Sequence, residues 1–398
     1  MTEALTNQAI TARRIQLESV LLAAAPLWRE MPFRIERPQW VDAFPELDAE
    51  LQCMPMDALA QLLGNNSALV QWLSDRVAIP GYRSGLIHVA ALARVGGNVE
   101  ARSAWGVPGR KLAQIEAFAS AVGKPPAAVL EWCAGKGHLG RLVAMTRGVD
   151  VTSLEIDPAL CHAGERLAER ARAAGQTFVV GDALRPEAAA MVAGRYVMAL
   201  HACGDLHRDL VSAAAGGGAA GVAIAPCCYY RLRETEYRPF SSDSRLRVSR
   251  DELHLAVTET VTAPDRNVRE RDRAAQWKLA FVAWREASGG GYRTFKPVPS
   301  AWMLQPFSEF MARICDREGL ASPPSSALSG LLKEGQRRFD VMMRRSAVRL
   351  AFRRVMELWL VCDLATPLID AGFRVSIDAF CDRMLTPRNL LLNATAPG

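Results

Sequence analysis

The stretch Val129-Leu-Glu-Trp-Cys-Ala-Gly-Lys-Gly-His-Leu-Gly140 decides the fold. A short apolar run with strand character, 127–130, leads into it and ends at the acidic residue Glu131. A glycine-rich turn follows at once, and the next residues begin a helix. We expect a strand, a turn and a helix whose backbone N–H groups and N-terminus face a ligand. Glycine at Gly135 and Gly137 lets the backbone approach that ligand closely.

Two further strands are expected, and each ends at a carboxylate. Glu155 is spaced from the glycines so that it can accept hydrogen bonds from both ribose hydroxyls of an adenosine ligand. Asp182 stands where an adenine amino group needs an acceptor. Because Glu131 precedes the glycines, the pattern suits a ligand with an ammonium group, which favours S-adenosylmethionine (SAM) over a dinucleotide. The alternative is a turn that only connects a strand and a helix. The expected cofactor-binding residues are Glu131, Gly135, Lys136, Gly137, His138, Glu155, Asp182 and Ala183.

Three blocks of sequence resemble a known family. They are Ala134–Gly140, Leu200-His-Ala-Cys-Gly-Asp-Leu206 and Pro226-Cys-Cys-Tyr-Tyr230. Together they resemble the Rossmann-fold methyltransferases grouped with methyltransferase-like protein twenty-five, and they are similar to the eukaryotic tRNA acceptor-stem 2′-O-methyltransferases. The resemblance covers about residues 107–230 and returns in Thr386-Pro-Arg-Asn-Leu-Leu-Leu392. It implies a SAM-dependent methyltransferase with a macromolecular substrate, either a protein side chain or tRNA.

The chain departs from the pattern of that family at two positions. Cys133 stands where the glycine run usually has its first glycine, and Tyr230 stands where a histidine often follows Cys-Cys-Tyr. The zinc-binding modules that accompany the tRNA enzymes are also absent from the sequence.

The order of the expected strands and helices predicts an α/β fold. From Pro125 to Cys228 strand and helix alternate five times, which indicates a parallel sheet with helices on both faces. Strands at 373–377 and 389–394 complete a seven-stranded, class I methyltransferase-like (Rossmann-like) sheet, with its sixth strand parallel and its seventh antiparallel. Three parts are expected: an N-terminal helical cap (1–106), the core (107–230 and 346–398), and an insertion after strand five that covers the active site (231–345).

Helical spacing of apolar residues predicts the remaining elements. The expected helices span 9–31, 57–77, 107–123, 158–174 and 350–371, the last with Gly372 as its stop. Between Arg337 and Arg354 there are seven arginines and a single acid, Asp340, on what we expect to be one long helix running to Ile369. This helix presents either a solvated structural face or a contact surface for RNA or an acidic protein.

The carboxyl ends of strands four and five carry the candidate catalytic residues. Methyl transfer from a sulfonium is an in-line displacement, so alignment and exclusion of water supply most of the catalysis. The candidates are His201, Asp205, Cys228 and Tyr229. His201 or Asp205 is the expected proton acceptor. The structural alternatives are a histidine hydrogen-bonded at a strand end and an aspartate that caps the next helix.

The connection between the last two strands, 378–388, is expected at the same edge of the sheet. It makes Arg388 and Asn389 candidate substrate-binding residues, and the alternative is an arginine that caps a strand end. A metal site at His201, Cys203, Cys227 and Cys228 is not expected. Sequence neighbours on a strand point to opposite sides, so only one of Cys227 and Cys228 should reach the other two.

Two other functions fit parts of the sequence. Cys203 and the pair Cys227 and Cys228 are placed like the thiols that methylate carbon 5 of pyrimidines in RNA, where a thiolate adds to the ring. A non-catalytic scaffold that binds the cofactor and holds a partner is the other possibility. The sequence leaves the oligomeric state open.

Composition favours a cytoplasmic protein. The N-terminus does not resemble a signal peptide, and no apolar run is long enough for a membrane span. The nine cysteines lack the spacing of a disulfide framework, which is typical of a reducing compartment. The formal net charge of +6 is too small to demonstrate nucleic-acid binding.

Overall fold

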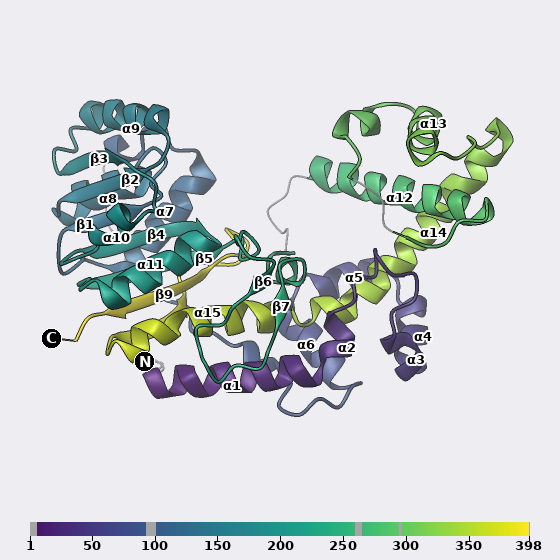
Figure 1. Ribbon diagram of the computed structural model, residues 1–398, viewed down its shortest axis with the longest axis horizontal. Helices are drawn as coiled ribbons and strands as arrows, with labels where there is room; N and C mark the ends of the chain where they lie inside the picture. Colours follow the sequence, from purple (N-terminus) through teal and green to yellow (C-terminus); the bar gives the residue numbers. More distant parts are fainter. Residues whose placement is uncertain (1–5, 93–100, 259–264, 294–296, 398) are drawn as a thin grey trace. The chain divides into compact units, whose positions relative to one another are not determined.

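A computed structural model describes residues 6–92, 101–258, 265–293 and 297–397 (Figure 1). The chain forms two compact units. The first consists of Met1–Ala23, Pro80–Thr262 and Arg353–Gly398, and the second of Ala24–Ile79 and Ala263–Phe352. The expected boundaries at 106, 230 and 345 do not coincide with these units. Residues 24–79 of the expected cap fold with residues 263–345 of the expected insertion, whereas residues 231–262 of the insertion belong to the unit that holds the sheet.

A seven-stranded sheet organises the first unit, in the order β3-β2-β1-β4-β5-β9-β8. Strands β1 to β5 pair in parallel, and β9 runs antiparallel to both β5 and β8. This order and polarity confirm the expected class I methyltransferase-like sheet. The strands are β1 (Val129–Trp132), β2 (Val151–Glu155), β3 (Gln176–Val180), β4 (Tyr196–Cys203), β5 (Gly221–Cys227), β8 (Arg374–Ala379) and β9 (Leu390–Thr395). The short strands β6 (Glu236–Tyr237) and β7 (Val248–Ser249) pair with each other.

Helices cover both faces of the sheet (Figure 1). On one face, α7 and α8 share a core with Tyr196 and Met198 of β4. Alternate residues of a strand point to opposite faces, so the fully buried Val197 and Ala199 lie on the other side, where α11 and α15 pack. The helices of this unit are α1 (Asn7–Ala23), α7 (Gly109–Val122), α8 (His138–Arg147), α9 (Pro158–Ala171), α10 (Pro186–Ala190), α11 (Asp205–Gly216) and α15 (Arg353–Asp370), with 3-10 turns η1 (Ser84–Ile87), η2 (Ala101–Ala104) and η3 (Glu252–Val257).

The second unit is helical in the part of the chain that the structure describes. The long helices α12 and α14 pack along each other, and an aromatic core that includes Phe281 and Phe310 joins α12 to α13. Its elements are α2 (Ala25–Trp28), α3 (Trp40–Ala43), α4 (Pro45–Cys53), α5 (Met56–Leu63), α6 (Asn66–Ser74), α12 (Asp265–Ala287), η4 (Ser300–Leu304), α13 (Phe307–Glu318) and α14 (Ser325–Leu350). The helix expected over 57–77 is therefore two helices.

The prediction of a single long helix from Arg337 to Ile369 is wrong. Helix α14 ends at Leu350 and α15 begins at Arg353. The turn between them buries Phe352 completely. Neither glycine nor proline marks this break, so helical spacing could not reveal it.

Candidate functional site

A pocket of about 540 Å³ opens at the carboxyl ends of the parallel strands, and we call it the strand-end pocket. Loops after β1, β2, β3 and β4 and the segment after β5 contribute its walls. Its lining residues are Cys133, Leu154, Glu155, Ile156, Gly181, Asp182, Ala183, Leu184, Cys203, Asp205, Leu206, Arg231, Leu232 and Arg233. The structure thus brings together Glu155, Asp182, Ala183 and Asp205 among the expected site residues.

The carboxylate of Glu155 is held rigidly at the end of β2. Its Oε2 accepts a hydrogen bond of 2.8 Å from the N–H of Gly135 in the glycine-rich turn. Its Oε1 accepts bonds of 3.0 and 3.1 Å from the N–H groups of Ile156 and Asp157. Three donors fix the orientation of the group, and a carboxylate has lone pairs to spare for two ribose hydroxyls.

Asp182 and its neighbours Gly181, Ala183 and Leu184 line the same pocket in the loop after β3. Asp182 Oδ1 accepts a 2.9 Å hydrogen bond from the N–H of Leu184, and the side chain is 34% exposed. Ile156 and Leu184 are large apolar side chains that remain 62% and 37% exposed. An apolar slot beside a fixed acceptor suits a flat heterocycle with an amino group.

Glu131 is not brought to the strand-end pocket, contrary to expectation. Its Oε2 accepts a 2.6 Å hydrogen bond from the hydroxyl of Ser153, and the N–H groups of Leu139 and Gly140 also donate to the carboxylate. Burial raises the pKa of Glu131 to about 7. Glu131 therefore anchors the N-terminus of α8 beneath the turn, and its contact with the ammonium group of a ligand stays a prediction.

The glycine-rich turn needs its glycines for two different reasons. Gly135 and Gly137 both have φ near +61°, a backbone conformation that residues other than glycine rarely adopt. Around Gly135 the space for a Cβ is open, whereas at Gly137 a Cβ would collide with the side chains of Gln176 and Phe178. Glycine at 137 thus serves internal packing, and the expectation that a side chain there would enter the space of the ligand is wrong.

The other two expected cofactor residues of the turn do not line the strand-end pocket. Lys136 is exposed. His138 is buried, and its Nδ1 has no hydrogen-bond partner among the described residues. Burial, aided by the charge of Arg141, lowers the pKa of His138 to about 4, so the ring is neutral near pH 7.

His201 lies near the end of β4 in a constrained environment. It has a φ of +66° and its Nε2 lies 3.1 Å from Oε1 of Gln114. The amide nitrogen of Gln114 donates to the carbonyl of Leu385, which assigns the oxygen to His201 and the ring proton to Nε2. Burial, with the charges of Arg388 and Lys111, lowers the pKa of His201 to about 4. The ring is therefore neutral, and Gln114 holds it in place. No pattern in the sequence indicated that Gln114 would contact His201.

Asp205 lines the strand-end pocket at the first residue of α11. Its Oδ2 accepts a 2.6 Å hydrogen bond from the N–H of Arg233 and lies 3.4 Å from the guanidinium of the same residue. The cap position belongs to Gly204, and the Asp205 side chain makes no capping bond. The carboxylate instead joins the start of α11 to the segment after β5.

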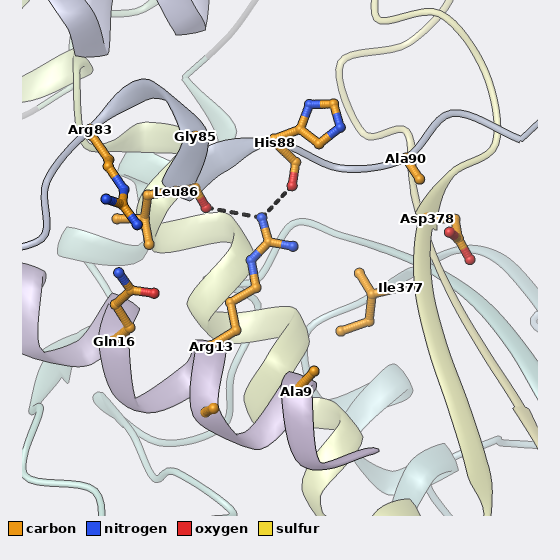
Figure 2. Close-up of a pocket in the computed structure, with 11 residues that line it drawn as sticks. Ala9, Arg13, Gln16, Arg83, Gly85, Leu86, His88, Ala90, Ile377 and Asp378 are labelled. Carbon is orange, nitrogen blue, oxygen red and sulfur yellow. Dashed lines mark hydrogen bonds between the residues drawn. The ribbon is translucent and has the colours of Figure 1, made fainter. Parts of the chain in front are cut away.

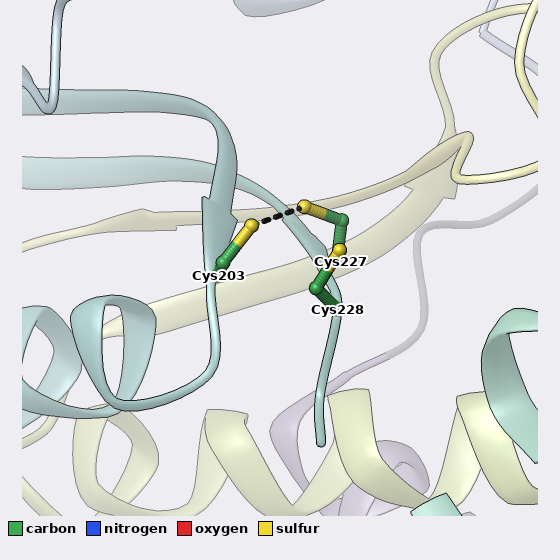
Figure 3. Close-up of side chains that lie close together, drawn as sticks. All are labelled: Cys203, Cys227 and Cys228. Carbon is green, nitrogen blue, oxygen red and sulfur yellow. Dashed lines mark hydrogen bonds between the residues drawn. The ribbon is translucent and has the colours of Figure 1, made fainter. Parts of the chain in front are cut away.

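Three thiols meet at the ends of β4 and β5, and we call Cys203, Cys227 and Cys228 the thiol cluster (Figure 3). The Sγ atoms of Cys203 and Cys227 are 3.1 Å apart. Cys228 has a φ of +39°, which turns its side chain back towards the cluster. The expectation that Cys227 and Cys228 point to opposite sides is therefore wrong, because the chain leaves the extended conformation at Cys228. A hydrogen bond from Cys227 lowers the pKa of Cys228.

Tyr229 is fully buried and does not line the strand-end pocket. Its ring meets that of His207 edge-on, with 5.6 Å between centroids, and its hydroxyl has no hydrogen-bond partner among the described residues. Burial, reinforced by the charge of Glu357, raises the pKa of Tyr229. Tyr229 therefore contributes to the packing of the core through its contact with His207.

The two expected substrate residues differ in their surroundings. The Asn389 amide donates a 2.8 Å hydrogen bond to the carbonyl of Cys381 and accepts one of 3.1 Å from Arg354. This buried side chain therefore joins the connection between β8 and β9 to the first turn of α15. Arg388 is half-buried, and its charge acts on His201. The role of Arg388 in binding a substrate stays a prediction.

A second pocket of the first unit, about 510 Å³, is built differently (Figure 2). Arg13 of α1 crosses it and donates hydrogen bonds to the carbonyls of Leu86 and His88. Asp378 of β8 is its one carboxylate, and it shares no lining residue with the strand-end pocket. Of these two pockets, the strand-end pocket is the one lined by both Glu155 and Asp182.

Residues 110–235, less than half of the chain, match the model of a methyltransferase domain family. No curated protein matches the chain. Similar solved structures include a putative sarcosine dimethylglycine methyltransferase from Galdieria sulphuraria, with 21% identity over 29% of this chain and 45% of that chain and a TM-score of 0.25. An O-methyltransferase family protein from Burkholderia thailandensis has 12% identity over 75% of this chain and 60% of that chain, with a TM-score of 0.32. The chain covers less than two thirds of each of these two proteins.

The family match and the strand order agree on the nature of the first unit. It contains a SAM-dependent methyltransferase domain with the class I fold. Among the described residues, every helix is too short or too polar to cross a lipid bilayer.

Proposed function

We propose that this protein is a methyltransferase that transfers the methyl group of SAM to a macromolecular substrate, a protein side chain or tRNA, in the cytoplasm. The observation that carries the proposal is the pair of carboxylates in the strand-end pocket. Glu155 is fixed by three backbone donors, and Asp182 stands beside an apolar slot. Ribose hydroxyls and an adenine amino group are the donors that these acceptors suit.

The placement of the adenosine end fixes where the methyl group would point. With the nucleoside between Glu155 and Asp182, the other lining residues include Cys203 and Asp205 at the end of β4 and Arg231, Leu232 and Arg233 after β5. The sulfonium then lies at the ends of β4 and β5. His201 does not line the strand-end pocket, but it is the proton acceptor that we propose, since its ring is neutral, its Nε2 carries the proton and its Nδ1 keeps a lone pair.

The substrate class rests on the resemblance to the methyltransferase-like protein twenty-five group and the tRNA acceptor-stem 2′-O-methyltransferases. One of the blocks that carry it, residues 200–206, supplies Cys203, Asp205 and Leu206 to the lining of the strand-end pocket. Arg231 and Arg233 are exposed residues of its wall, so a substrate would approach past two guanidinium groups. Phosphate oxygens or acidic side chains would complement them.

The test is transfer of labelled methyl groups from SAM into cell extract, followed by digestion with RNase or protease. We expect label in a macromolecular fraction that one of the two digestions releases. The variant Glu155→Ala should transfer no label, while Glu169→Ala, which changes an exposed carboxylate of α9, should behave as wild type. Binding of SAM without transfer to any fraction would contradict the enzyme and leave a cofactor-binding scaffold.

A further inference from the structure

The thiol cluster has the composition and geometry of a metal site. We propose that Cys203, Cys227 and Cys228 bind one Zn²⁺ ion, with the fourth coordination position open. The three Sγ atoms all lie within 4.8 Å of one another (Figure 3). Around tetrahedral zinc, with bonds of about 2.3 Å, sulfur atoms stand about 3.8 Å apart. Movements of less than an ångström or so at each sulfur, on the order of rotamer adjustments, would therefore close the site.

Two irregularities of the backbone create the cluster. The pairing of β4 with β5 shifts register between Leu200 and Cys203, and Cys203 then pairs directly with Cys227. Bulges of this kind re-aim side chains and are frequent next to active sites. The second irregularity is the left-handed conformation of Cys228, which follows the last residue of β5.

Left-handed backbone at non-glycine residues supports a function for this arrangement. His201, two residues before Cys203, and Cys228 itself have φ values of +66° and +39°. Such conformations cost on the order of 1–3 kcal/mol each and concentrate at functional sites. A role in packing alone would not require the chain to turn Cys228 back beside two other thiols.

Charge balance is also consistent with a divalent cation. Each thiol loses its proton to the solvent when it ligates zinc, so three thiolates leave the site with a net negative charge. The guanidinium of Arg231 interacts electrostatically with Cys203 and Cys228. This positive group next to the cluster would offset the excess charge of the loaded site.

The position of the cluster indicates what the ion would do. Three protein ligands with one open position are typical of catalytic zinc, and structural sites have four. Cys203 is shared between the cluster and the strand-end pocket. If the proposed function holds, the open position would bind the acceptor atom of the substrate and lower its pKa, so that its proton is lost to the solvent. The deprotonated acceptor would then form a bond to the methyl carbon as the bond between that carbon and the sulfonium breaks, which releases S-adenosylhomocysteine.

Elemental analysis of the full-length protein, purified under reducing conditions without chelators, tests the zinc site. We expect one zinc per chain in the wild type and none in Cys203→Ser, Cys227→Ser or Cys228→Ser. Cys53→Ser, at an exposed thiol of the second unit, should retain the metal. Replacing zinc by Co²⁺ should produce the intense near-ultraviolet absorption of cobalt–thiolate bonds in the wild type and in Cys53→Ser only.

Other outcomes would overturn the inference. One is a reduced wild-type protein that takes up neither Zn²⁺ nor Co²⁺. Another is a Cys203–Cys227 disulfide, found by mass spectrometry, in a protein that binds no metal after reduction. Cys228 does not line the strand-end pocket, so Cys228→Ser should still bind S-adenosylhomocysteine, which shows that the variant is folded. Intact zinc in a protein that binds no cofactor would instead contradict the proposed function.

Discussion

At the scale of single residues, the glycine-rich turn is held from below by a buried carboxylate. Glu131 accepts hydrogen bonds from Ser153 and from the first N–H groups of α8, yet burial outweighs them and raises its pKa to about 7. The folded protein therefore binds a proton at Glu131 more tightly than the unfolded chain, whose glutamate titrates near its ordinary pKa of about 4.3. The stabilisation of the fold by this tighter proton binding is complete below the unfolded-state pKa of about 4.3 and is lost as the pH rises through the folded-state pKa of about 7.

We predict that Glu131→Gln removes this part of the pH dependence of stability. A neutral amide keeps an acceptor for the N–H groups and does not ionise. The free energy of unfolding of the wild type relative to Glu131→Gln should fall by on the order of 3 kcal/mol between pH 4.5 and 7.5. Urea unfolding at several pH values measures the difference, with Glu169→Gln as an exposed control. A constant difference across this range would show that Glu131 stays ionised in the folded protein.

At the scale of elements, α14 uses its arginines inside the second unit. Arg345 makes two hydrogen bonds of 2.9 Å to the carboxylate of Asp48, and both side chains are nearly buried. Arg344 donates to the carbonyl of Met54, and Arg349 is 5% exposed. These contacts favour the structural alternative for the arginine-rich segment over a surface that contacts RNA.

Arg345→Ala should therefore destabilise the second unit. Removing one partner leaves the carboxylate of Asp48 buried without its countercharge, which costs about 3–5 kcal/mol for a buried pair. The double variant Arg345→Ala, Asp48→Ala should recover much of that loss, and Arg337→Ala, at a 63% exposed side chain, should have a small effect. Thermal unfolding with intrinsic fluorescence compares the variants. If Arg345→Ala unfolds like the wild type and loses affinity for RNA, the structural assignment of this arginine fails.

At the scale of the whole molecule, the sequence pattern predicts the strands of the sheet better than it predicts the contacts in and around the strand-end pocket. Strand and helix periodicity was enough to predict the seven-stranded fold, and carboxylates at strand ends pointed to Glu155 and Asp182, which line the strand-end pocket. Hydrogen bonds between residues distant in sequence could not be predicted, such as those of Gln114 with His201 and of Arg233 with Asp205. The rule that side chains alternate along a strand also fails where a residue leaves the extended conformation, as Cys228 does with its positive φ. The division into units was missed because residues 24–79 and 263–352 meet only in the folded chain.

The central claim is that the strand-end pocket holds the adenosine part of SAM. Calorimetric titration of the full chain with S-adenosylhomocysteine tests it most directly. We predict one site per chain, weakened by about 10- to 100-fold in Asp182→Ala and in Glu155→Ala, because each leaves hydrogen-bond donors of the ligand unpaired at about 1–3 kcal/mol. Glu169→Ala should bind as the wild type does. Wild-type affinity in both pocket variants, or no binding by the wild type, would contradict the account.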